Sequence, residues 1–228
     1  NVREESDCDR LPVINGADFN LRLGSGISQE EFEGTAVNFI GLKFIQMNGL
    51  NSIKPSPQVV MTDLCLGDAA SVGKGFFQLE NVANLILHRT IVNLANSTGI
   101  ISYLSYGDGY LPKADQIQAK INIENITMNV LNIGIEASIY VPVHFFKFQV
   151  ATTVDNTPIP DTQLIINNVI FQNKGFTPRV YMKVFEIIGF ETVNLKGLTF
   201  RDQKLRMLLD GRLLQFEKIG KLTLKNIE

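Results

Sequence analysis

The sequence predicts an all-β solenoid, and three observations lead to that prediction. First, two stretches near the C-terminus, Val184–Arg201 and Leu213–Ile227, share one apolar pattern at a constant offset. Second, apolar residues alternate with others at period 2 in this pattern, which is typical of strands. Third, the core of the pattern, apolar-x-apolar-x-x-apolar-x-apolar, recurs along the chain. Short strands with a break cannot bury their apolar side alone, whereas stacked copies can.

The break in the middle of each repeat core indicates its geometry. The cores begin at Val37, Val59, Leu85, Ile121, Leu164, Val193 and Leu222. The second residue of the break is Gly41, Asp63, Arg89, Asn125, Asn168, Gly197 or Asn226 in the successive copies. All but one are Gly, Asn or Asp, which tolerate positive φ at a tight corner. We therefore expect a strand, a bend in the left-handed region and a second strand in each copy.

A third strand precedes the core in at least three copies. Phe77 and Leu79 lead into the third core, and equivalent apolar residues lead into the last two. A coil of three short strands joined by turns of variable length is a parallel β-helix. The uneven intervals between the cores favour this architecture over a leucine-rich repeat, which keeps a nearly fixed period.

The chain divides into two parts in this prediction. Residues 1–36 lack the pattern and form an N-terminal cap segment, because an uncovered solenoid end exposes strand edges. Residues 37–228 form the β-helix, with two insertions: Leu94–Lys120 is expected as an ordered loop, and Val130–Gln163 as further strands followed by a loop. The repeat stops inside a coil at Glu228. We therefore expect a segment of a longer rod, or an end that another subunit covers.

The repeats from Val37 to Ile227 resemble the right-handed parallel β-helix of the pectin-lyase-like superfamily, in which coils carry Asn at one tight turn. Relatives that cleave polysaccharides place acid pairs, or an Arg or Lys base with calcium-binding carboxylates, on one outer face. Here neither outward row of the core contains a carboxylate, so the acid pair of glycoside hydrolysis is missing from these rows. We assign no catalytic residue and expect a non-catalytic protein; acids such as Asp108 and Asp202, converging from loops, would instead indicate an enzyme.

Composition excludes several classes of protein. The chain has 228 residues, 45% of them hydrophobic, and a net charge of −2, so it is not a disordered or charged tail. Its mixed charges argue against nucleic-acid binding, and no apolar run reaches membrane-spanning length. His88 and His144 are isolated, and no Cys/His cluster has metal-ligand spacing. We therefore expect neither a metal nor a cofactor.

Five apolar residues fall at outward positions of the core, where water is expected: Val60, Ile86, Ile91, Ile165 and Ile170. One interpretation is that the two insertions fold back over this face. The other is a patch for contact with another protein, since exposed apolar surface marks interfaces.

Three tyrosines, Tyr103, Tyr106 and Tyr110, surround a Gly-Asp-Gly turn in the first insertion. They are candidates for stacking on sugar rings. The alternative is that they anchor the loop onto the rod.

The two cysteines, Cys8 and Cys65, are candidates for a disulfide that ties the cap segment to the second coil, if the compartment is oxidising. Asn96 and Asn125 lie in glycosylation sequons. Asn125 is also a corner residue, so an inward ladder of Asn side chains would prevent its modification, and Asn96 is the better acceptor.

These features predict an extracellular or cell-surface protein of structural or adhesive type. We expect it to self-associate, or to bind a neighbouring chain of an assembly, through its open end or an apolar side face. This step rests on analogy with surface β-helix proteins. The alternative is a polysaccharide-binding or polysaccharide-degrading β-helix protein.

Overall fold

The computed structural model describes residues 5–15, 36–45, 51–53, 56–67, 75–94, 99–105, 119–130, 143–153, 155–173, 182–201 and 214–228. Apart from one short 3-10 helix, η1 (Glu5–Arg10), the regular elements in these ranges are strands. Every pairing between the described strands is parallel. The all-β architecture predicted from the repeats is therefore confirmed.

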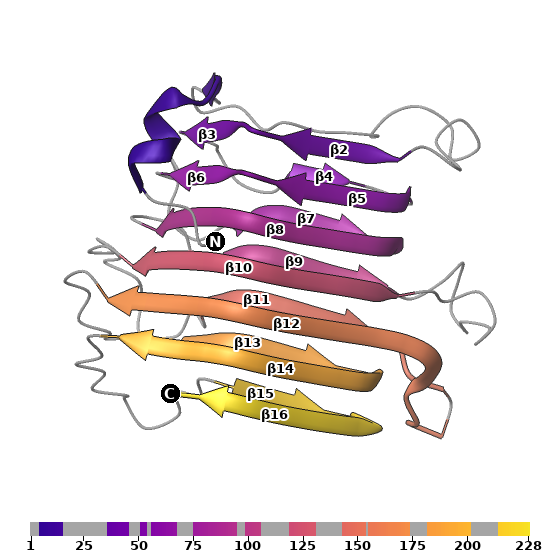
Figure 1. The fold of residues 1–228 in the computed structure, drawn as a ribbon. Helices are drawn as coiled ribbons and strands as arrows, with labels where there is room; N and C mark the ends of the chain where they lie inside the picture. Colours follow the sequence, from indigo (N-terminus) through magenta and orange to yellow (C-terminus); the bar gives the residue numbers. More distant parts are fainter. Residues whose placement is uncertain are drawn as a thin grey trace.

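The strands form two sheets that lie against each other (Figure 1). The ten-stranded sheet has the order β1-β3-β6-β8-β10-β12-β14-β16, with β2 and β5 paired beside it. The six-stranded sheet has the order β15-β13-β11-β9-β7-β4. Each turn of the chain adds to both sheets, as in a solenoid; the first two full coils add two strands to the ten-stranded sheet, and the later coils add one. Neither sheet closes on itself within the described ranges, and the arrangement is compatible with a parallel β-helix.

The strands of the ten-stranded sheet are β1 (Val13–Asn15), β2 (Val37–Ile40), β3 (Lys43–Ile45), β5 (Ser56–Thr62), β6 (Cys65–Gly67), β8 (Val82–Leu94), β10 (Lys120–Val130), β12 (Ile159–Asn173), β14 (Phe190–Arg201) and β16 (Lys221–Ile227). Those of the six-stranded sheet are β4 (Asn51–Ile53), β7 (Gly75–Glu80), β9 (Gly99–Ser105), β11 (Val143–Val150), β13 (Met182–Ile188) and β15 (Leu214–Glu217).

One column of residues bends the ten-stranded sheet into a first arm and a second arm. The bend column contains Gly41, Asp63, Arg89, Asn125, Asn168, Gly197 and Asn226, and all have φ between 47° and 69°. The predicted left-handed bend is therefore confirmed in every copy. In the first two coils it separates two strands, β2 from β3 and β5 from β6. In the later coils a single long strand runs through it.

Side chains that point inward from both arms and from the six-stranded sheet form one continuous core. In parallel register, residues of one row stack on the same row of the next coil; Ile121 of β10 pairs with Leu164 of β12, and Ile126 with Val169. The six-stranded sheet supplies stacked aromatic rings, such as Phe146 and Phe185 at 5.0 Å between ring centroids. The one polar residue in an inward row, Thr90, is buried and donates a hydrogen bond to the His88 carbonyl at 3.3 Å.

The N-terminal segment contributes two described elements. β1 pairs with β3 and extends the second arm by one strand at the N-terminal edge of the stack. η1 lies beside β3 and β6 (Figure 1). Residues 16–35, which were expected to belong to the cap, lie outside the described ranges.

The insertions differ from the sequence-based expectation at one point. Leu94–Lys120 was expected to be a loop, but it contains β9, which pairs with β7 and β11 in the six-stranded sheet. The second insertion, Val130–Gln163, contains β11 as the expected further strand. The third strand of the coil therefore occurs in more copies than the apolar pattern alone indicated.

Candidate functional site

Large apolar side chains are unusually exposed at the C-terminal end of the stack. β16 and β15 are the last strands of their sheets, and each pairs on one side only within the described ranges. Their outer edges therefore present unpaired backbone donors and acceptors, which are a template for another strand.

The inward row of β16 is open to solvent. Leu222, Leu224 and Ile227 are 41%, 46% and 39% exposed, whereas Val193, Leu195 and Leu198, their register partners on β14, are 0–1% exposed. The same apolar pattern is thus fully buried in one coil and uncovered in the next. The exposure follows from the position of β16 as the last strand of its sheet among the described residues.

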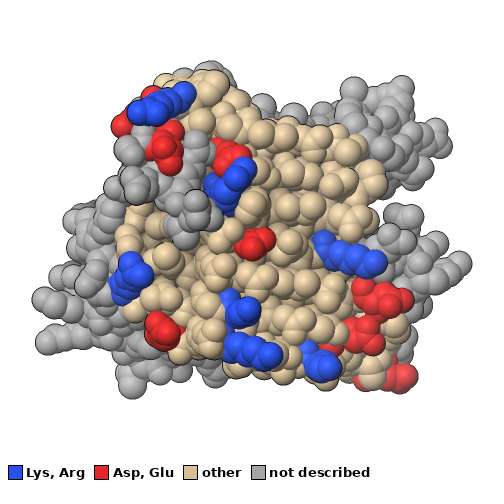
Figure 2. All heavy atoms as spheres, in the orientation of Figure 1, with Lys and Arg blue, Asp and Glu red and all other residues tan. Residues whose placement is uncertain are grey.

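Lysines flank this apolar edge. Lys221 and Lys225 are exposed and lie on either side of Leu222 and Leu224 on the first arm of β16. Lys225 is in register with Lys196 of β14. Figure 2 shows both basic and acidic side chains toward this end of the stack, while much of the face above it is uncharged. Lys218, at the corner before β16, donates to Asn156 Oδ1 at 2.6 Å.

The N-terminal end of the stack differs from the C-terminal end. Phe39 of β2 is 8% exposed and Phe44 of β3 is fully buried, although they belong to the first full coil. The edge of β3 is already paired with β1. The two ends are therefore not equivalent, and only the C-terminal end uncovers its inward row among the described residues.

The residues of the predicted outward apolar patch differ in how deeply they are buried. Ile91 is 1% exposed and packs against Cys8, Cys65 and Leu11 in a small satellite cluster. The expectation that Ile91 belongs to an accessible interface was therefore wrong, because the N-terminal segment covers it. Val60, Ile86, Ile165 and Ile170 are half-buried.

A shallow hollow of about 330 Å³ lies over the first arm, between the coils of β5, β8, β10 and β12. Its lining combines apolar side chains of the predicted patch with polar ones: Gln58, Asn84, Ile86, Lys120, Asn122, Gln163 and Ile165. Asn84 donates to the Pro57 carbonyl at 3.2 Å. Side-chain amides both donate and accept hydrogen bonds, so this row is chemically suited to hydroxyl-rich ligands.

Tyr103 cannot stack on a sugar ring, which corrects the sequence-based expectation. Its side chain is fully buried, lies beside Phe148 and donates from its hydroxyl to the Val82 carbonyl at 2.5 Å. Burial raises the pKa of the phenol above its usual value, and a hydrogen bond with the Ser105 side chain lowers it by a smaller amount. Because Tyr103 lies on β9 rather than in a loop, its ring points into the core. Tyr106 and Tyr110 lie outside the described residues.

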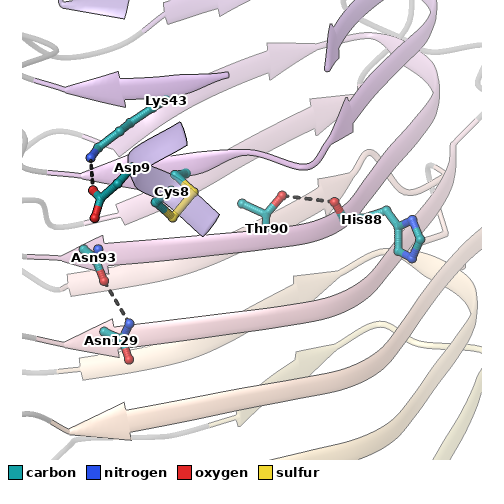
Figure 3. The surroundings of a disulfide bond; sticks show 8 residues. Cys8, Asp9, Lys43, His88, Thr90, Asn93 and Asn129 are labelled. Carbon is teal, nitrogen blue, oxygen red and sulfur yellow. Dashed lines mark hydrogen bonds and ion pairs between the residues drawn. A yellow bond between two sulfur atoms is a disulfide. The ribbon is translucent and has the colours of Figure 1, made fainter. Parts of the chain in front are cut away.

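The two cysteines are joined in the structure. The Cys8 and Cys65 sulfurs are 2.01 Å apart, and the bond ties η1 to β6 on the outer side of the second arm (Figure 3). Asp9 on η1 adds an ion pair to Lys43 at 3.1 Å. Both contacts hold η1 over Ile91.

The two sequon asparagines have different positions. Asn125 is in the bend column, and its Nδ2 lies 3.2 Å from His88 Nε2 while its Oδ1 accepts from Asn168 Nδ2 at 3.3 Å. This ladder of polar contacts between coils occupies the nitrogen to which a glycan would be attached. Asn96 lies outside the described residues.

The sequence reading missed one polar cluster, on the outer face of the six-stranded sheet. Glu186 on β13 is 6% exposed, and its carboxylate lies 2.8 Å from Lys183 Nζ and 3.7 Å from Lys147 Nζ. The alternation in Phe185-Glu186-Ile187 would have placed this carboxylate on the outer face. Glu186 is thus the centre of an ion cluster with Lys183 and Lys147.

No set of three or more His, Cys, Asp or Glu side chains converges in the described ranges as a metal site would require. No helix in those ranges is long and apolar enough to cross a membrane.

Comparison of the chain with protein-family models, with curated proteins and with solved structures found no match.

Proposed function

We propose that the chain is a right-handed parallel β-helix of the pectin-lyase-like architecture that serves as a non-catalytic structural or adhesive protein outside the cell or on its surface. It joins a neighbouring chain of an assembly through an apolar side face on the first arm. The observation that carries this proposal is that Val60, Ile86 and Ile165 face outward there and are only half-buried. The disulfide between Cys8 and Cys65 supports an oxidising compartment.

The mechanism of assembly is burial of this side face. A partner covers Ile86 and Ile165, which the stack leaves half-buried. Apolar surface that stays accessible in this way is typical of interfaces. Complete enclosure of a large apolar side chain contributes up to about 1.5–3 kcal/mol.

The test is the native mass of the protein in material from its source. Ile86→Asp with Ile165→Asp places two charges on the apolar side face. We expect size exclusion with light scattering to show a large species for the wild type and a smaller one for the double variant. A monomeric wild type, or a double variant that assembles normally, would refute assembly through this face.

A second candidate function is binding of a polysaccharide, and the amide-lined hollow over the first arm favours it. Asn122 and Gln163 present hydroxyl-complementary groups there beside Ile86 and Ile165. Affinity electrophoresis of the wild type on neutral and acidic polysaccharides tests this candidate. Retardation that Asn122→Ala with Gln163→Ala abolishes is the expected result, and unretarded wild type removes the candidate.

A further inference from the structure

The outer face of the first arm consists of three rows of side chains. Every second residue of each strand faces outward, and the parallel register stacks these residues from coil to coil. The middle row contains Asn38, Val60, Ile86, Asn122, Ile165 and Asn194. The leading row, two residues earlier on each strand, contains Gln58, Asn84, Lys120, Gln163 and Thr192. The trailing row, two residues later, contains Thr62, His88, Glu124, Asn167 and Lys196.

Two opposite charges lie on either side of the middle row at β10. Lys120 is in the leading row and is exposed, and Glu124 is in the trailing row and is half-buried. Four residues of strand separate them by about 13 Å, so they do not pair with each other. Neither forms an ion pair with another described residue. Figure 2 shows that few other charged side chains lie over this face of the sheet.

A second copy of this face is complementary to the first when a two-fold axis lies along the middle row. Rotation about this axis reverses the direction of the strands, keeps the order of the coils and sets each leading row opposite the other copy's trailing row. Lys120 of each copy then lies opposite Glu124 of the other. In the middle row Ile86 and Ile165 each lie opposite their own counterparts. A contact of this kind, in which both copies use the same surface, is the commonest arrangement in homodimers.

The hollow over the first arm lies where the incoming carboxylate would be. Its volume is about 330 Å³, and its lining includes Lys120 between Asn84 and Gln163. In the two-fold arrangement, Glu124 of the second copy faces this hollow. The two side-chain amides can donate hydrogen bonds to the carboxylate beside the lysine ammonium.

The charges oppose the other two-fold arrangement of the same face. An axis parallel to the strands would set Lys120 opposite Lys120 and Glu124 opposite Glu124, and like charges across an interface are repulsive. With the axis along the middle row, like charges meet only at β16, where Lys221 and Lys225 continue the leading and trailing rows. Packed sheets cross at about 30°, which separates the rows away from the centre. The contact is therefore centred on β10 and ends before β16.

We propose that the partner of the first-arm face is a second copy of this chain, related by a two-fold axis along the middle row and held in register by reciprocal pairs between Lys120 and Glu124. This inference rests on the proposed function, because that function supplies the face. Burial of Ile86 and Ile165 against their counterparts stabilises the dimer, and the two charge pairs select its orientation.

Charge reversal with the purified full chain tests the pairing. Sedimentation equilibrium should show a dimer for the wild type. Lys120→Glu or Glu124→Lys replaces two attractive pairs with two repulsive ones, and each should weaken the dimer about tenfold. An equimolar mixture of these two variants should regain the wild-type affinity, because both attractive pairs form again in the mixed dimer. Recovery in the mixture also shows that both variants are folded.

Lys196→Glu is the matched control. It reverses a charge in the same trailing row, but its counterpart across the axis is the neutral Thr192, so the affinity of the dimer should stay unchanged. A monomeric wild type, single variants that dimerise as tightly as the wild type, or a mixture no tighter than its components would each overturn the inference.

The proposed function fails separately. If the purified wild type is monomeric but Ile86→Asp with Ile165→Asp lowers the native mass in material from the source, this face joins the chain to a different protein. The proposed function then stands and the inference falls. If the double variant assembles normally, this face is not the joint, and both are refuted.

Discussion

At the scale of single residues, the bend column fixes where each coil turns. Its seven residues all adopt positive φ, and five of them carry a side chain, including Arg89 at 47°. Positive φ costs a residue with a side chain about 1–2 kcal/mol, and short polar side chains recover part of it through local hydrogen bonds. The Arg89 guanidinium instead reaches Asp63 in the preceding coil at 2.6 Å. Contacts between coils therefore hold the bend even where the residue is unfavourable.

Substitution of two glycines at positive φ distinguishes the cost of backbone strain from the cost of steric overlap. Gly41 has φ of 64° and open space where a Cβ would lie; Gly189 has φ of 84°, and a Cβ there would overlap the Val150 carbonyl oxygen. We expect Gly41→Ala to lower the free energy of unfolding by about 1 kcal/mol. Gly189→Ala should lower it by about 3 kcal/mol, because overlap with backbone adds to the strain. Urea denaturation of both variants measures the difference, and equal losses would contradict it.

The contacts of Asn125 predict its modification state. Its Nδ2 is engaged with His88 in the ladder between coils, so a glycan there prevents the neighbouring coils from stacking. We expect glycopeptide mapping of the folded secreted protein to find Asn125 unmodified and any N-glycan at Asn96. Substitution of Asn96 by Gln should then remove the whole carbohydrate mass. Folded protein with a glycan on Asn125 would show that the ladder is dispensable.

At the scale of elements, a disulfide and an ion pair attach η1 to the stack. The disulfide to Cys65 closes a sequence separation of 57 residues, and Asp9 pairs with Lys43. Beneath η1 lies Ile91, which is 1% exposed and packs against Cys8, Cys65 and Leu11. The cross-link thus helps to keep an apolar outward position buried.

Removal of this disulfide should destabilise the protein. Chain-entropy arguments for a loop of this length give a loss of about 3–4 kcal/mol in the free energy of unfolding for Cys8→Ser with Cys65→Ser. The thermal midpoint of the double variant should fall accordingly. Reductant should lower the midpoint of the wild type and leave the double variant unaffected. A wild type that responds to reductant no more than the variant would show that the bond does not form in solution.

The sequence predicts strands and bends better than it predicts what covers them. The period-2 rows and the break residues identify both arms, since each follows from local alternation and local φ. The strand β9 escapes prediction because Tyr103, with a polar hydroxyl, occupies an inward position. The Val82 carbonyl, which is distant in sequence, accepts the hydrogen bond of that hydroxyl. The burial of Ile91 is equally non-local, because η1 reaches it through Cys8. The buried Glu186 could have been found by reading the third strand with the same alternation.

At the scale of the whole molecule, the stack behaves as a row of coils in which each contacts its neighbours. Stability in such arrays is close to a sum of coil terms and interface terms. A coil inside the stack has two interfaces, and the coil of β15 and β16 has one within the described ranges. Equivalent residues in the same row should therefore contribute unequally to stability, according to how many of their neighbours are present.

Leu195 and Leu224 test this dependence, because they are register partners in adjacent coils with the same side chain. Leu195 is 1% exposed and Leu224 is 46% exposed. We expect Leu195→Ala to lower the free energy of unfolding of the isolated chain by about 3 kcal/mol, as in a filled core, and Leu224→Ala by under about 1 kcal/mol. Urea denaturation of the two variants measures both losses. Equal losses would contradict the expectation that a residue's contribution depends on how many neighbouring coils cover it.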